Sequence, residues 1–174
     1  MNTQKEPEDF IYENIEVLRE EITYFIKSSE LKIEEEKDYL AQIVLPFKQA
    51  TNDLKKETNR LLESKNSSSA FRVTAVIGLL NSQLDSINAQ LSLKANIISQ
   101  SKGVTTVWNK VSASWNTLVG RLKSIIQTIS SYLWQLISRL LTLREWSISG
   151  TVSTPSITSL FGPSGSATIQ ITFG

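Results

Sequence analysis

The side chains of this chain that could do chemistry are carboxylates, cations and indoles, because its 174 residues include no Cys and no His. This composition excludes thiol and imidazole nucleophiles, disulfides, and metal sites built on thiolate or imidazole ligands. Glu34-Glu35-Glu36 is interpreted as a solvated acidic face, and Asp85 as a surface or ion-paired residue. Catalysis by carboxylates alone stays open, but no pattern of them favours it. We therefore expect no enzyme activity, no cofactor and no metal.

The charges are distributed unevenly along the chain. Residues 1–66 include 15 acidic and 10 basic residues, whereas residues 67–174 include two acidic and eight basic ones. Either the basic half binds an anionic surface, or the two halves of one bundle attract each other. The basic residues are spread out and lack interleaved aromatic platforms for stacking on bases, so we expect no nucleic-acid binding.

Residues 124–143 are the strongest candidate for membrane contact. This stretch contains one charge, Arg139, and its length suits a bilayer-spanning helix, although its Ser, Thr and Gln residues make it marginal. The alternative is the central helix of a bundle, and both hold if the protein changes state. We predict contacts with an anionic membrane or with other copies through Ile125, Ile126, Ile129, Leu133, Trp134, Leu136, Ile137, Leu140, Arg139 and Arg144.

The C-terminal segment has a different composition. Residues 147–174 contain no charge, and Ser and Thr alternate there with apolar residues, a pattern typical of β-strands. We predict a β-hairpin with a long loop. A lone hairpin is marginal in water, so it must pack on the helices, pair with another copy or insert in a membrane. The residues predicted to pair are Ile148, Val152, Ile169, Ile171 and Phe173.

Helices must position these segments. The first is expected from about Pro7, with one apolar stripe at Ile11, Ile15, Leu18, Ile22 and Phe25. Residues 27–39 are polar nearly all round and form either a loop, with Ser28 or Ser29 capping a second helix, or part of one long helix. The next stripe runs from Leu40 to Leu61, and Pro46 is expected to kink or break the helix.

Two further helices are expected in the second half of the chain. Asn66 to Ser69 form a turn and cap cluster before a helix with apolar positions from Val73 to Ile98, closed by Gly103. The last helix has a heptad seam from Val104 to Leu143, about 60 Å long. Trp108 and Trp115 lie on this seam and are expected in the core, whereas Trp134 lies off it.

The fold class is therefore mainly α. We expect a bundle of three to four long helices in residues 1–145, and a β-hairpin tail in residues 146–174 that packs on the bundle or serves assembly. The order of parts is an acidic helical front, a nearly acid-free helical hairpin over residues 73–144, and the uncharged tail. This layout resembles the helical membrane-targeting domains of cell-death systems, namely the HeLo-like domains of fungi and the Bell-type domains of bacteria. It is also similar to α-helical pore-forming toxins.

The resemblance implies oligomerisation and membrane permeabilisation, and it assigns no individual residues. We expect a membrane-perturbing effector that forms homo-oligomers through its helices and its hairpin. The alternative is a structural or adaptor protein whose C-terminal strand pairs with a partner protein. The acidic, polar N-terminus shows no signal peptide, so we expect a cytoplasmic form when soluble and a membrane-associated form when active.

Overall fold

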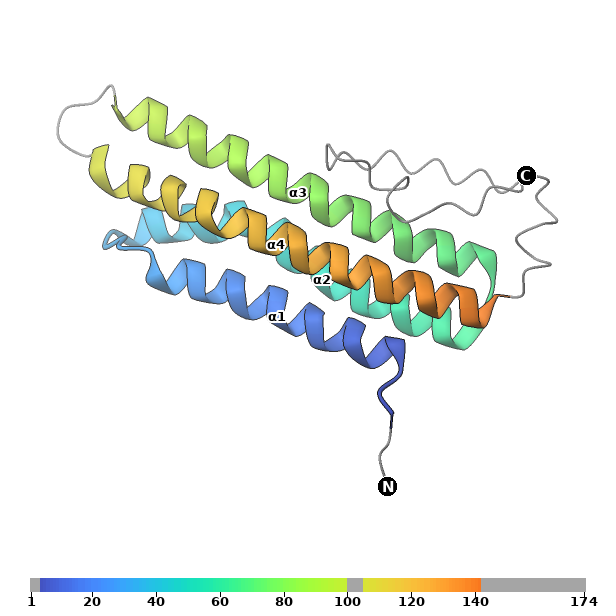
Figure 1. The fold of residues 1–174 in the computed structure, drawn as a ribbon. Helices are drawn as coiled ribbons and strands as arrows, with labels where there is room; N and C mark the ends of the chain where they lie inside the picture. The colour runs from blue at the N-terminus through green and yellow to red at the C-terminus, as the bar shows by residue number, and fades with distance from the viewer. Residues whose placement is uncertain (1–3, 100–104, 142–174) are drawn as a thin grey trace.

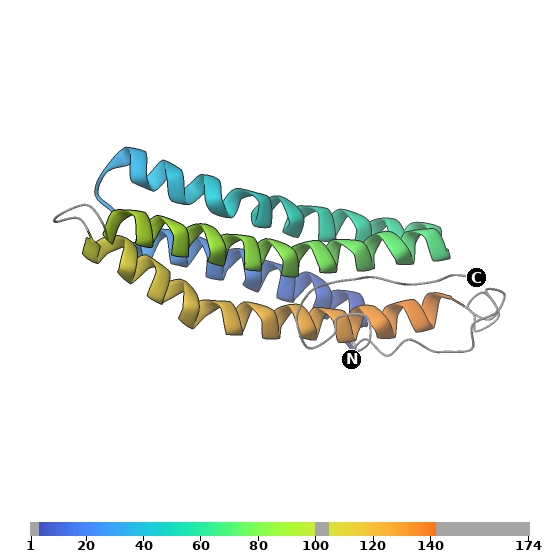
Figure 2. The ribbon, with the colours of Figure 1, turned by 90° about the horizontal axis from the view of Figure 1, so that it is seen from above.

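Four antiparallel helices form a bundle in the computed structural model, which describes residues 4–99 and 105–141. They are α1 (Pro7–Ser28), α2 (Glu34–Ser64), α3 (Ser67–Ser99) and α4 (Thr105–Leu140). Each helix packs on its two neighbours around the bundle, so that α4 lies between α1 and α3 and α2 contacts both α1 and α3 (Figures 1 and 2). The predicted helical bundle is confirmed and has four members.

The start of α1 follows the predicted signals. Pro7 occupies the first turn, and the Asp9 carboxylate accepts a hydrogen bond of 3.0 Å from the backbone N–H of Glu6, the N-cap residue. Glu8 and Asp9 also place negative charge at the positive end of the helix dipole. The five residues of the predicted stripe are all buried: Ile11, Ile15, Leu18, Ile22 and Phe25.

The polar stretch after α1 contains a break between two helices. The prediction that Ser28 or Ser29 caps the second helix is wrong. Their hydroxyls donate instead to the carbonyls of Phe25 and Ile26, at 3.2 and 2.7 Å, and so close the last turn of α1. The N-cap residue of α2 is Ile33. Glu34, Glu35 and Glu36 fill the first turn of α2, where the helix dipole favours acidic side chains.

Pro46 does not break α2, which continues from Glu34 to Ser64. The apolar stripe on both sides of the proline is buried, including Ile43 and Phe47 at 4 and 0% exposure. Packing of this stripe in the core therefore outweighs the hydrogen bond that proline cannot donate.

Replacing Pro46 should stabilise the protein. The side chain is exposed, so Pro46→Ala opens no cavity and supplies an N–H for the carbonyl of Gln42. We expect the free energy of unfolding to rise by about 1–3 kcal/mol in urea denaturation. The matched control is Gln49→Ala, an exposed position on the same helix, which should change stability by less than about 0.5 kcal/mol. Equal effects of the two substitutions would contradict this account of Pro46.

The turn between α2 and α3 matches the predicted cap cluster. Lys65 ends α2 in the left-handed conformation at a φ of 52°. The side-chain oxygen of Asn66 accepts a hydrogen bond of 2.9 Å from the backbone N–H of Ser69, as an N-cap residue does. This short connection sets α3 antiparallel to α2.

The buried face of α4 begins to depart from the heptad prediction at Leu118, a seam position that is only partly buried. Before that point Trp108, Val111 and Trp115 are buried as expected. The same spacing recurs five helical turns later at Ile126, Ile129 and Leu133, as it does on a straight helix that is not supercoiled. The prediction that Ile125, Tyr132 and Leu140 continue the buried seam is therefore wrong in register, and all three are only partly buried.

The predicted hairpin lies outside the described residues, as does Gly103. The same holds for Arg144 and for the five residues predicted to pair in strands: Ile148, Val152, Ile169, Ile171 and Phe173.

Candidate functional site: the interface of α1 and α4

The apolar stripe of α1 covers one face of α4. Two aromatic pairs join the helices near opposite ends of the interface. Phe10 stacks on Tyr132 with ring centroids 4.5 Å apart, and Phe25 meets Trp115 edge-on at 5.4 Å. Aromatic pairs of this kind add about 0.5–1.5 kcal/mol beyond the area they bury. The interface is therefore held by packing along nearly the whole length of α1.

Three cations of α4 flank this packed interface. Arg121 follows Lys110 by about three helical turns, and Arg139 follows Arg121 by five, so the three side chains lie on one line along the helix. We call these three residues the α4 charge row. Each pairs with a carboxylate from the N-terminal part of the chain: Lys110 with Glu30 at 3.1 Å, Arg121 with Glu21 at 3.2 Å, and Arg139 with Glu6 and Glu8.

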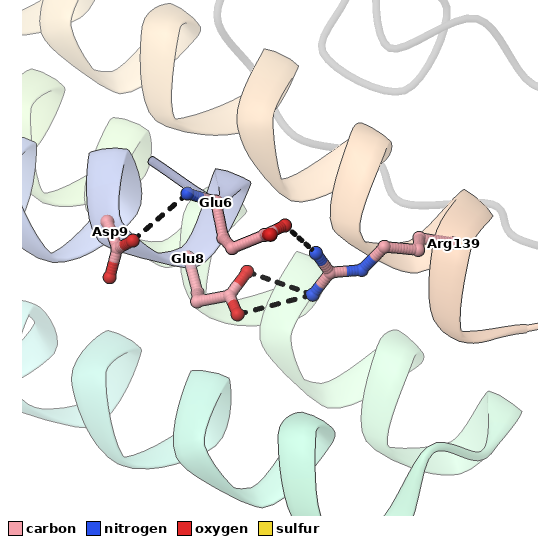
Figure 3. Close-up of polar contacts among 4 residues, drawn as sticks. All are labelled: Glu6, Glu8, Asp9 and Arg139. Carbon is pink, nitrogen blue, oxygen red and sulfur yellow. Dashed lines mark hydrogen bonds and ion pairs between the residues drawn. The ribbon is translucent and has the colours of Figure 1, made fainter. Parts of the chain in front are cut away.

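The contact of Arg139 is the most elaborate of the three. Figure 3 shows its guanidinium between two carboxylates at the start of α1, with one nitrogen directed to Glu6 and the other to Glu8. The distance to the nearer Glu8 oxygen is 3.0 Å. Because Glu6 is the N-cap residue and Asp9 accepts from its backbone N–H, the same cluster caps α1 and binds it to α4. We call Glu6, Glu8 and Arg139 the N-terminal latch.

These ion pairs relate to the uneven distribution of acidic and basic residues along the chain. The acidic front of the chain contacts the basic second half directly, and Lys123 of α4 also pairs with Asp85 of α3 at 3.4 Å. Lys94 lies over the rings of Tyr39 and Trp108, at 4.6 and 5.5 Å from their centroids. The contacts support the interpretation that the two halves of the bundle attract each other. They also identify Asp85 as ion-paired.

The residues predicted for membrane or assembly contact fall into two groups. Most of the apolar ones are in the core, with at most 1% exposure: Ile126, Ile129, Leu133, Leu136 and Ile137. The others are partly buried or exposed: Ile125, Trp134 and Leu140 are partly buried, and Arg139 is exposed. The apolar group can meet a membrane only after the bundle opens. A substitution such as Leu133→Glu would bury a charge and unfold the protein, so a loss of membrane binding in that variant could not be assigned to lost membrane contact.

Trp108 and Trp115 are fully buried, as their place on the seam predicted. Neither indole N–H has a hydrogen-bond partner in the part of the chain that the structure describes. A buried donor without an acceptor costs about 1–3 kcal/mol. Within the described residues, the N-terminal half of α4 thus contains two buried donors without an acceptor: Trp115 packs on Phe25 of α1, and Trp108 on Tyr39 of α2.

Tyr12 connects α1 to the neighbouring helix α2. Its hydroxyl donates a hydrogen bond to the side-chain oxygen of Asn59. Burial raises the pKa of Tyr12 above its usual range, and the negative charges of Glu8 and Asp9 raise the pKa further. The phenol is therefore neutral at physiological pH and remains a hydrogen-bond donor.

The one described depression that acidic side chains line is open to solvent. Glu16 and Glu20 line a shallow, open depression, but all of its described lining residues come from the outer face of α1, and Glu16 pairs with Arg19 at 3.5 Å. Within residues 4–99 and 105–141 no three acidic side chains are grouped to hold a metal ion. In that same part, no helix combines the length and the apolar character that crossing a bilayer requires.

The sequence patterns did not predict the carboxylates of the interface. Glu6, Glu8, Glu21 and Glu30 were part of the acidic front, and Lys110 and Arg121 part of the basic half, without assigned partners. The spacing of the α4 charge row by nearly whole helical turns was the signal that could have placed these cations on one face. No protein-family model, curated protein or solved structure matches the chain. The resemblance to cell-death domains and pore-forming toxins therefore stays a prediction.

Proposed function

We propose that the protein is a non-enzymatic, membrane-perturbing effector, and that the described bundle is its resting form. In the active form α1 leaves α4, and α4 lies on an anionic membrane while copies assemble through their helices and the C-terminal segment. The resting form is cytoplasmic and the active form is membrane-associated. The observation that carries this proposal is the double character of α4. It has a wide apolar surface that the other helices cover, and beside it a row of three exposed cations that pair with carboxylates of α1 and of the residues flanking α1.

Anionic lipid can replace α1 both at the cations of α4 and at its apolar surface. Headgroup phosphates accept charge-assisted hydrogen bonds from Arg and Lys as carboxylates do, so the α4 charge row can exchange Glu for phosphate. The apolar face beside the row would enter the acyl boundary, as the face of an interfacial amphipathic helix does. The indoles of Trp108 and Trp115, which find no acceptor among residues 4–99 and 105–141, would move to an interface where such rings are preferred.

The energetics favour opening on a membrane over opening in water. The five buried apolar side chains of α1 contribute roughly 1.5–3 kcal/mol each, or about 8–15 kcal/mol together. This is comparable to the whole stability of a typical domain, so α1 would rarely leave α4 without a new apolar surface to contact. A bilayer supplies that surface, and membrane contact would then be coupled to release.

Dye release from lipid vesicles tests the proposal. We expect the intact chain to sediment with vesicles that contain phosphatidylserine and to release their dye, and to act much more weakly on purely zwitterionic vesicles. If the protein neither sediments with the anionic vesicles nor releases their dye, even at concentrations where it self-associates, the proposal fails.

A second candidate is a structural or adaptor protein. It is favoured by the pairing of the α4 charge row with carboxylates of the same chain, which gives these cations partners without any lipid. In this case the helices form a stable rod, and residues 166–174 add a strand to the sheet of a partner. It predicts no lipid binding, and a partner complex that is lost when residues 166–174 are deleted.

A further inference from the structure

One strip on the outer face of α3 carries exposed apolar side chains. Ile97 follows Leu79 by five helical turns, so the two lie on the same side of the helix, and Leu93 lies close to that line. The exposed fractions of Leu79, Ile97 and Leu93 are 41, 59 and 60%. Ser86 and Gln90 lie between them and are also exposed. We call these five residues the α3 strip.

The strip contains no charge, although it faces outward. Two charged residues of α3 are adjacent to this stretch, and both engage neighbouring helices: Asp85 pairs with Lys123 of α4, and Lys94 lies over the Tyr39 ring of α2. The exposed Arg72 lies on the same side of α3 about two turns before Leu79, outside the strip, and the outer faces of α1 and α2 carry exposed charges such as Glu20 and Lys56. An outward face that is partly apolar and uncharged is typical of a surface that contacts another segment.

We propose that the α3 strip is the docking surface for the chain's own C-terminal segment, residues 147–174. This segment shares the property that distinguishes the strip, because none of its residues is charged and its apolar residues alternate with Ser and Thr. Docking would therefore bury no unpaired charge on either side. It would also supply the surface that a two-stranded hairpin needs in water.

The position and length of the segment fit this surface. The last residue of α4, Leu140, lies at the end of the bundle where α3 begins, because the two helices are antiparallel neighbours (Figure 1). The strip begins at Leu79, about 18 Å along α3 from Ser67, and lies about 10 Å to the side of α4. Residues 141–146 can extend about 20 Å and so reach its near end. The strip itself is about 27 Å long, which a strand of about eight residues spans, so residues 147–174 suffice for two such strands and a loop.

The size of the strip favours a tethered segment over a second copy of the chain. An area of about 27 by 10 Å is roughly 300 Å², well below the about 800 Å² that each partner buries in a standard protein interface. A segment tethered through residues 141–146 has an effective concentration in the millimolar range, so that a weak contact suffices. This inference does not depend on membrane activity.

Paramagnetic relaxation in the intact chain tests the docking. The chain has no Cys, so a nitroxide can be attached at a single introduced thiol. With the label at Ser86→Cys, on the strip, we expect strong broadening of the amide signals of Ile169 and Ile171 in the 15N-labelled protein. With the label at Glu20→Cys, an exposed position on α1, these signals should stay sharp. Equal broadening from both positions, or none from Ser86, would overturn the proposal.

Two further experiments distinguish docking within one chain from docking of a second copy, and test whether the strip residues are needed. One sample mixes chains that carry the nitroxide but no 15N with chains that carry 15N but no nitroxide. In this sample the amide signals should not broaden. Broadening in that mixture would mean that a second copy occupies the strip, which contradicts the proposal. The double substitution Leu79→Glu with Ile97→Glu should restore sharp signals in the labelled chain, whereas Tyr24→Glu with Leu45→Glu, which also replaces two exposed apolar residues, should not. Broadening that persists in the Leu79→Glu, Ile97→Glu chain would equally overturn the proposal.

Discussion

A covalent bridge between α1 and α4 should reduce dye release to the background rate of vesicles without protein. The bridge is made with a reducible bifunctional thiol reagent in the Glu21→Cys, Arg121→Cys variant, which has no other thiols. Glu21 and Arg121 contact each other at 3.2 Å near the middle of the interface, so a reagent as long as the two side chains spans the gap without moving the helices. Because α1 must separate from α4 before the apolar face can meet lipid, the bridged protein cannot act. Cleaving the reagent with a reductant should restore release in the same sample.

The matched control is a bridge of the same kind between α3 and α4. The Asp85→Cys, Lys123→Cys variant also replaces one ion pair that joins α4 to a neighbour, here at 3.4 Å. In our account α3 and α4 need not separate, so this bridged protein should still release dye. If both bridges block release, general stiffening of the bundle is the cause. If neither does, α1 is not the element that moves.

Reversing two acidic residues of the interface should increase dye release about five- to thirtyfold at low protein concentration. In the Glu8→Lys, Glu21→Lys variant, Lys faces Arg139 and Arg121 of the α4 charge row. Exposed pairs contribute up to about 1 kcal/mol each, and like charges in their place repel by similar amounts, so we expect the interface to lose about 1–2 kcal/mol. A change of this size alters a two-state population by the stated factor. The α4 cations that would contact lipid are left unchanged.

The control for this prediction has the same change in net charge at other positions. Glu20 and Glu63 are exposed and neither pairs with the α4 charge row. In the Glu20→Lys, Glu63→Lys variant the added positive charge strengthens attraction to anionic vesicles, and we expect dye release to increase by this effect alone. Urea denaturation should show lower stability only for the interface variant. If the two variants match in both dye release and stability, the carboxylates of α1 do not hold the α4 face closed.

The apolar stripes predicted the fold well where local periodicity decides the structure. All five stripe residues of α1 are buried, and so are Leu40, Phe47 and Leu61 of α2, because a single apolar face admits only one orientation toward a core. The cap at Asn66 was also predictable, since its hydrogen bond to Ser69 is local in the sequence.

The failures come from features that depend on the whole bundle. At Ile125 and Ile126 both residues are apolar, so composition did not distinguish a supercoiled heptad seam from a straight helix, and the structure follows the straight one. At Pro46 a local rule predicted a kink or break, and the break is absent because burial of the flanking stripe keeps α2 continuous. At Ser29 a good cap residue closes the preceding helix instead of opening the next one.

The candidate site was predictable only in part. The sequence identified α4 as the unusual helix, but it could not show which element covers α4. The partners of Arg139, Glu6 and Glu8, lie far from it in the sequence, and such a pairing follows from the antiparallel order of four helices. The charge difference between the halves was the only long-range signal, and it was compatible both with an anionic surface and with the bundle itself.

The time course of dye release from vesicles by the unmodified chain shows whether the protein is a membrane-perturbing effector. Vesicles with phosphatidylserine and vesicles of phosphatidylcholine alone would be loaded with a small dye and with a large dextran, and treated at several ratios of protein to lipid. The account predicts rapid release of the small dye from the anionic vesicles, a steep dependence on protein concentration because copies assemble, and little release from the neutral ones. Protein that leaves the anionic vesicles intact at every ratio would contradict the proposed function and would favour the structural or adaptor role.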